Sequence, residues 1–165
     1  MTEGLAAVRR DGGALALRLE RTYDASPEEV WAAFTEPESI RRWLFADAIL
    51  EPRVGGRAEF RWSEDGAAVG VVREWDPPRL LELSWAEGHG ASIVRVEIAA
   101  AGGGSLLVLD HRNVTPSSAI GLGAGWHAHL VALADVVAGR DAVADRWEPL
   151  YRSLRPEYEA LVEAV

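Results

Sequence analysis

Residues 126–138 read WHAHLVALADVVA, and this stretch decides the fold that we expect. Its apolar side chains recur at i, i+4, i+7, i+8 and i+11, and they are Trp126, Leu130, Leu133, Ala134 and Val137. That spacing predicts one amphipathic helix with a broad apolar face. Gly139 stands just beyond it, where helices commonly end. An apolar face of this breadth must be buried against another layer, and the preceding sequence predicts a sheet.

The sequence before this helix has the period of β-strands. Residues 14–23 alternate apolar and polar side chains, which predicts a half-buried strand. Further strand-like runs follow, at 47–51, 56–62, 67–75, 79–85, 92–99 and 105–114. Short turn signals rich in Gly, Asp and Pro separate them, including the segment 87–90, and none is long enough for a parallel crossover. We therefore expect an antiparallel meander.

Two short helices are predicted between the first strand and the meander. Ser26 fits an N-cap, Pro27 the first helical position and Glu29 the third, and this combination is typical of a capped helix start. Pro37 ends that helix and begins a second, shorter one that carries Trp43.

Two segments flank the long helix. Residues 121–125, GLGAG, precede it, and we expect either a mobile gate to an internal cavity or a flexible connector there. Residues 145–165 carry aromatic and leucine side chains at helical spacing, interrupted by Pro156, which predicts a pair of terminal helices docked on the body. We accordingly expect one domain over residues 1–140, with a helical extension over residues 141–165 packed on it.

Together these elements predict an α+β fold. A curved sheet of six to seven antiparallel strands would wrap around the long helix, with the two short helices after the first strand. Such a meander often cannot fill its interior completely, so we expect a pocket between helix and sheet.

Composition excludes several functions. The 165 residues include no cysteine and no lysine, which excludes disulfides, thiolate catalysis, Cys-ligated zinc and Schiff-base chemistry. A net charge of -9 with scattered arginines argues against nucleic-acid binding. We expect no membrane span, no secretory signal and hence a cytoplasmic location. We also expect no cofactor and no metal, since His127 and His129 would point about 200° apart on a helix.

The order and spacing of several segments resemble a known family. They are ASPEEVWAAFT at 25–35, Trp43, VGGR at 54–57, residues 70–80 ending in DPPRL, LSW at 83–85, LVLDH at 107–111, and Gly125-Trp126. Over about residues 14–140 the chain resembles the helix-grip fold of the START-like (SRPBCC) superfamily. Within it, the chain looks like the branch related to the C-terminal domain of activators of the Hsp90 ATPase.

The resemblance implies an internal pocket for hydrophobic small molecules. Members of the superfamily bind lipids, polyketides or hormones, and a minority catalyse cyclisation or aromatisation. Hsp90 co-chaperones of this branch carry a separate N-terminal domain and a linker, and we expect this chain to differ from them in that respect.

Strand alternation places a set of large side chains on common faces. If these faces are concave, the cavity walls are Trp43, Phe60, Trp62, Leu83, Trp85, Leu109, His111, Trp126 and Leu130, with Trp43 near the mouth. We therefore predict binding of a small hydrophobic or aromatic molecule. Plain core packing is the alternative interpretation of the same residues.

Two other functions stay open. An enzyme of the cyclase or hydrolase kind would use His111 with Glu74 or His129 as acid and base, with Glu74 facing inward and His127 facing away from the pocket. An interaction protein, including an Hsp90-type chaperone regulator, would use an exposed apolar surface. A homodimer would form through the tail helices.

Overall fold

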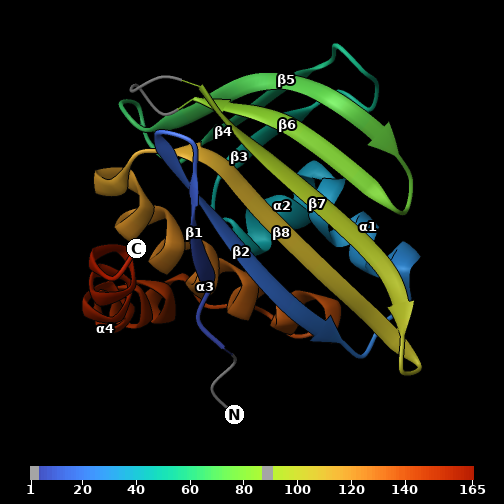
Figure 1. Cartoon of the computed structure of the whole chain (residues 1–165). Coiled ribbons are helices and arrows are strands. Elements are labelled where there is room, and N and C mark those ends of the chain that lie inside the picture. The colour runs from blue at the N-terminus through green and yellow to red at the C-terminus, as the bar shows by residue number, and fades with distance from the viewer. Residues whose placement is uncertain (1–3, 87–90) are drawn as a thin grey trace.

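Eight strands form one antiparallel sheet in the computed structural model, which describes residues 4–86 and 91–165. The strands are β1 (Ala7–Asp11), β2 (Ala14–Tyr23), β3 (Asp47–Leu50), β4 (Arg57–Arg61), β5 (Ala67–Asp76), β6 (Leu80–Ala86), β7 (Ala91–Ala101) and β8 (Gly104–Val114). Their order across the sheet is β1-β2-β8-β7-β6-β5-β4-β3, so β3 to β8 form a meander whose last strand returns to β2. Figure 1 shows the sheet curving around the helices on its concave side. The predicted α+β helix-grip fold is confirmed.

Four helices accompany this sheet in the described residues. They are α1 (Pro27–Thr35), α2 (Pro37–Trp43), α3 (Pro116–Val137) and α4 (Ala144–Glu163). In Figure 1, α3 runs beneath the sheet, α1 and α2 occupy another part of its concave side, and α4 packs on α3. Length and composition would also let α3 cross a membrane, but core helices share these properties, and α3 packs between the sheet and α4.

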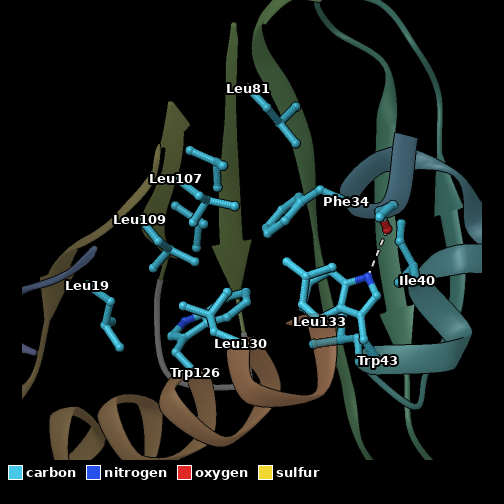
Figure 2. Close-up of a cluster of buried hydrophobic side chains, with 14 of the residues drawn as sticks. Leu19, Phe34, Ile40, Trp43, Leu81, Leu107, Leu109, Trp126, Leu130 and Leu133 are labelled. Atoms are coloured by element: carbon cyan, nitrogen blue, oxygen red, sulfur yellow. Dashed lines mark hydrogen bonds between the residues drawn. The ribbon is translucent and has the colours of Figure 1, made fainter. Parts of the chain in front are cut away.

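The core lies between α3 and the central strands. In Figure 2, Trp126, Leu130 and Leu133 rise from α3 toward the sheet, where Leu107 and Leu109 of β8 meet them. All four of these leucines are fully buried. Each buried leucine contributes roughly 1.5–3 kcal/mol to stability, so this contact is a principal reason why the sheet closes on the helix.

The predicted start of α1 is confirmed in detail. The Ser26 hydroxyl accepts from the Glu29 N–H at 3.2 Å, and the Glu29 carboxylate accepts from the Ser26 N–H at 2.8 Å. This reciprocal pair is a capping box. At the end of α2, the Trp43 indole donates to the Ala33 carbonyl at 2.8 Å, as the dashed line in Figure 2 shows, and so folds α2 back on α1.

The long helix begins at Pro116 rather than at Trp126. Thr115 is its N-cap, and the Thr115 hydroxyl accepts from the Ser118 N–H at 3.2 Å. Residues 121–125 therefore lie inside α3, and the prediction of a gate or connector there is wrong. Close packing accounts for one of their glycines, because a Cβ on Gly123 would lie 2.5 Å from Cδ1 of Tyr158 on α4.

The tail is one helix, α4, rather than the predicted pair. Pro156 lies inside it and removes one backbone hydrogen bond. Leu154 and Tyr158, which stand on either side of the proline, are buried in the core shared with α3. Burial of these side chains outweighs the local cost of the proline, so the helix continues.

An edge strand, β1, raises the strand number above the six to seven expected. It pairs with β2, placing Val8 opposite Leu17. Most β1 side chains are exposed, so the strand lacks the alternation that reveals a half-buried strand in a sequence. Just before it, the Ala6 N–H donates to the Tyr158 hydroxyl at 2.9 Å. The turn predicted at 87–90 lies outside the described residues.

Replacing Gly123 with alanine should destabilise the protein, because the new Cβ would overlap the Tyr158 ring. We expect the free energy of unfolding to fall by about 1–3 kcal/mol, the usual cost of overpacking. Gly125→Ala is the matched control on the same helix: no neighbouring atom lies within 4 Å of its added Cβ. This control should gain about 1 kcal/mol through helix propensity. Urea unfolding in which the two variants are equally stable would contradict the packing described.

Candidate functional site

A cavity of about 580 Å³ opens between the first half of α3, one end of the sheet and α4. Its lining consists of Leu44, Phe45, Trp62, Trp85, Ser92, Asn113, Val114, Thr115, Ser117, Ser118, Gly121, Leu122, Gly125, Trp126, His129, Trp147, Tyr151 and Arg155. The sheet and α4 contribute mainly aromatic rings, whereas the start of α3 contributes hydroxyl groups. The cavity is therefore amphipathic.

The floor of the cavity is a cluster of aromatic rings centred on Trp85 of β6. Ring centroids of Phe60, Trp126 and Trp62 lie 5.2, 5.4 and 6.1 Å from that of Trp85. Trp62 is also fixed through its indole, which donates to the Leu44 carbonyl at 2.8 Å. Packing in several directions makes this floor a rigid apolar surface.

Behind this floor, His111 of β8 is completely buried and bonded through both ring nitrogens. The Trp126 indole donates to its Nδ1 at 3.0 Å. An indole can only donate, so Nδ1 must accept and the proton of neutral His111 lies on Nε2. Nε2–H then donates to the Ser92 hydroxyl at 2.6 Å, and Ser92 donates to the Trp85 carbonyl at 2.9 Å. The directions of all three bonds are thereby determined.

Ser92 and His111 have the spacing of a nucleophile and its base, but not the protonation. A general base would have to accept the serine proton at Nε2, and here Nε2 already carries a proton. Burial lowers the pKa of His111 to about 3, which keeps the ring neutral near pH 7. The arrangement therefore links the sheet to α3 and does not activate Ser92.

His129 reaches the cavity from α3. Its Nδ1 lies 3.0 Å from the Trp43 carbonyl, which can only accept, so Nδ1 carries the proton and Nε2 is left as an acceptor. Burial lowers the pKa of His129 to about 4. Trp147 packs on the ring with centroids 4.9 Å apart. His129 thus presents a neutral aromatic surface with one acceptor nitrogen.

The wall opposite the sheet comes from α4. Trp147 and Tyr151 stand one turn apart and stack, with centroids 4.8 Å apart and planes inclined by 11°. Arg155, a further turn along, donates from Nη1 to the Tyr151 hydroxyl at 2.8 Å. Sequence reasoning found the helical spacing of this tail but missed its role in the cavity, because spacing does not show which surface a helix faces.

Two indole N–H groups of the lining have no hydrogen-bond partner among the described residues. They belong to Trp85 and Trp147, and both nitrogen atoms are buried. Leaving a buried donor unpaired costs about 1–3 kcal/mol. The indoles of Trp43, Trp62 and Trp126 all donate to the protein itself, whereas the indole nitrogens of Trp85 and Trp147 are enclosed without a partner.

The predicted wall residues fall into two groups. Trp62, Trp85 and Trp126 line the cavity. The others lie in the core behind it, and they are Trp43, Phe60, Leu83, Leu109, His111 and Leu130. Trp43, expected near the mouth, is 1% exposed, so that expectation is wrong. Leu130 and Leu133 pack against the middle of the sheet, so along α3 the cavity reaches only from Ser117 to His129.

Glu74 lies on the outer face of the sheet, so it does not take the inward position that the enzyme hypothesis requires. A register shift between Val72 and Glu74 marks a β-bulge. The bulge reverses the alternation of sides, and Trp75 takes the inward position and packs on Trp31 at 5.1 Å. Glu74 pairs instead with Arg95 at 3.2 Å.

His127 is absent from the cavity lining, yet it is buried. Its Nδ1 lies 3.0 Å from the Tyr158 hydroxyl, because α4 covers this side of α3. Burial, together with the positive charge of Arg21, lowers the pKa of His127 to about 4. Across residues 4–86 and 91–165, no three side chains of the metal-ligating types form a group that could hold an ion.

The His111 ring should stay neutral, with its proton on Nε2, from pH 8 down to about pH 4, since its folded pKa is about 3. The unfolded chain has a higher pKa, about 6.5, so it takes up a proton that the folded protein excludes. The contribution of neutral His111 to the free energy of unfolding is therefore fully present above about pH 6.5 and is lost as the pH falls. At pH 5 this group alone lowers the free energy of unfolding by about 2 kcal/mol.

Nitrogen-15 NMR of the histidine rings, combined with urea unfolding at pH 7 and pH 5, measures both effects. Titration of His111 near pH 6.5, or a ring proton on Nδ1, would contradict the hydrogen-bond directions given above.

Comparison with known proteins shows which family the chain belongs to. The family model described as activator of Hsp90 ATPase homolog 1-like protein matches residues 24–138. The mouse protein "Activator of 90 kDa heat shock protein ATPase homolog 1" is 32% identical over 82 residues. That stretch is 47% of this chain and only 23% of the mouse protein, so the chain matches less than a quarter of this relative's length.

Solved structures extend the likeness to almost the whole chain. CalU16 from Micromonospora echinospora is 27% identical with a TM-score of 0.76, and the match covers 96% of each chain. The BPP1335 protein from Bordetella parapertussis is 26% identical with a TM-score of 0.72, covering 96% of this chain and 91% of the other. Because the family model spans most of the helix-grip fold, the chain belongs to the activator of Hsp90 ATPase homolog 1-like family of the START-like superfamily.

Proposed function

We propose that the protein binds a small aromatic or hydrophobic molecule in the cavity between the sheet, α3 and α4. The observation that carries this proposal is a cavity whose lining is largely aromatic, with Trp62, Trp85, Trp126, Trp147 and Tyr151 around one space. Apolar walls with a few polar groups are the usual composition of small-molecule sites.

The size of the cavity supports the proposal. Its volume, about 580 Å³, lies within the range of roughly 300–1,000 Å³ that is typical of ligand pockets. In this proposal residues 1–140 form the binding domain, and the extension at 141–165 closes the cavity through α4. The cytoplasmic location and the homodimer through the tail stay predictions.

The family supports the same function at a coarser level. A helix-grip fold implies an internal pocket for hydrophobic small molecules, and CalU16 and BPP1335 share this fold over nearly their whole length. The chemical class of the molecule must be inferred from the residues that line this particular cavity.

The two alternative functions have less support. A cyclase or hydrolase would need His111 to exchange a proton together with Glu74 or His129, but Trp126 occupies the acceptor nitrogen of His111, and Glu74 pairs with Arg95 instead. A chaperone regulator would need a continuous apolar surface. On the outer face, the exposed side chains of Ile49 and Val69 flank Glu59 on the strand between them, so charge interrupts that surface.

Filling the cavity should abolish binding. Gly125 lines the cavity and has open space where a side chain would begin, so the ring of Gly125→Phe would occupy the ligand volume. We expect the wild-type protein to bind 2-naphthol, measured by quenching of tryptophan fluorescence, and the variant to lose at least about 90% of that affinity, a change of about 1.4 kcal/mol.

Val131→Phe is the matched control, since Val131 lies on the same helix, is 39% exposed and does not line the cavity. Its affinity for 2-naphthol should equal that of the wild type. If a folded Gly125→Phe variant bound 2-naphthol as tightly as the wild type, this result would contradict the proposed site.

A further inference from the structure

We propose that the bound molecule is an aromatic acid, and that Arg155 binds its carboxylate or an equivalent anionic oxygen group. This inference rests on the proposed function and specifies the chemical class of the ligand. It assigns the aromatic part of the molecule to the Trp85 side of the cavity and the anion to the end where α4 meets the start of α3.

Charge on the lining is the first reason. Arg155 is the one charged side chain that lines the cavity within the described part of the chain, and no carboxylate lies beside it there. The neighbouring Arg152 pairs with Glu148, whereas no ion pair joins Arg155 to any described residue. A positive group without a counter-charge at the edge of an apolar space favours an anionic ligand.

The position of the guanidinium is the second reason. Arg155 donates to the Tyr151 hydroxyl at 2.8 Å, and Tyr151 is itself stacked on Trp147. One of the five N–H donors is used in this contact, so the others remain for a ligand. The Tyr151 oxygen accepts here, which leaves its own proton to donate. Gly121 of α3 faces this group, since a Cβ there would lie 3.4 Å from the Tyr151 hydroxyl and 3.9 Å from Nη1 of Arg155.

Further donors stand one turn away on α3. Ser117 and Ser118 line the cavity in the first turn of that helix, at its positively polarised end. The Thr115 hydroxyl donates to the Ser118 oxygen at 2.9 Å, so the proton of Ser118 remains available to a ligand. An anion at this end would meet a guanidinium and several hydroxyl donors, while its aromatic body would meet the indole of Trp85.

A matched pair of probes tests the inference: 2-naphthoate, which carries a carboxylate, and 2-naphthamide, which has the same shape without the charge. Isothermal titration calorimetry would compare wild type, Arg155→Gln, Arg155→Lys and Arg152→Gln at low salt. The wild type should bind 2-naphthoate at least about tenfold more tightly than 2-naphthamide, the factor expected for a charge-assisted hydrogen bond. Arg155→Gln should remove that difference, Arg155→Lys should retain part of it, and Arg152→Gln should retain all of it.

The outcomes separate the two proposals. Equal affinity of the wild type for both probes would overturn the acidic ligand and leave the aromatic site standing. A preference for 2-naphthoate that survives in Arg155→Gln would overturn the role of Arg155. Failure of both probes to bind the wild type would overturn the proposed function together with this inference.

Discussion

The hydrogen bond from the Trp126 indole to Nδ1 of His111 is the interaction on which the rest of the structure depends. It joins α3 to β8 at a completely buried point, and it continues through Ser92 to the carbonyl of Trp85. A polar chain inside an apolar core is favourable only when every member has its partner, so this bond fixes the rotation of α3 about its axis. With Trp126 held against β8, the side chain of Leu130, one turn later, must also face the sheet.

Once that rotation is set, the glycines of α3 determine where the helix packs and where space remains. Gly123 faces α4 and admits the Tyr158 ring, which brings the two helices together. Gly121 and Gly125 are four residues apart on another face, and both line the cavity. A bulkier residue at either position would occupy volume that the structure leaves open. The glycines of α3 thus account both for the close contact between the two helices and for the cavity beside it.

Much of the fold could be predicted because its signals are local. The alternation of 14–23 and the capping box at Ser26 depend on neighbouring residues alone, and both were confirmed. The errors concern contacts between distant segments. Glycines at 121–125 favour a loop by propensity, and only the packing of Tyr158 on α4 explains why Gly123 is small within a helix. The outward position of Glu74 depends on a bulge at Val72, which no periodicity reveals.

The site could be predicted from the sequence to about the same extent as the fold. Alternation showed that Trp85 and His111 face inward, but it could not show that one borders a cavity and the other is enclosed behind it. The wall formed by α4 and the two unpaired indoles required coordinates, since both depend on how the tail docks. Together they changed the expected site from a pocket between the long helix and the sheet to an amphipathic cavity bounded by the start of α3, one end of the sheet and α4.

The most direct test of the central claim observes the seven indole N–H groups by nitrogen-15 NMR while 2-naphthol is added. A molecule bound in the cavity should shift the signals of Trp85 and Trp147 strongly, because its aromatic ring would lie against their indole rings. The signals of Trp31 and Trp43, which do not line the cavity, should stay in place. Unchanged signals from Trp85 and Trp147 at saturating 2-naphthol would contradict the claim that this cavity is the binding site.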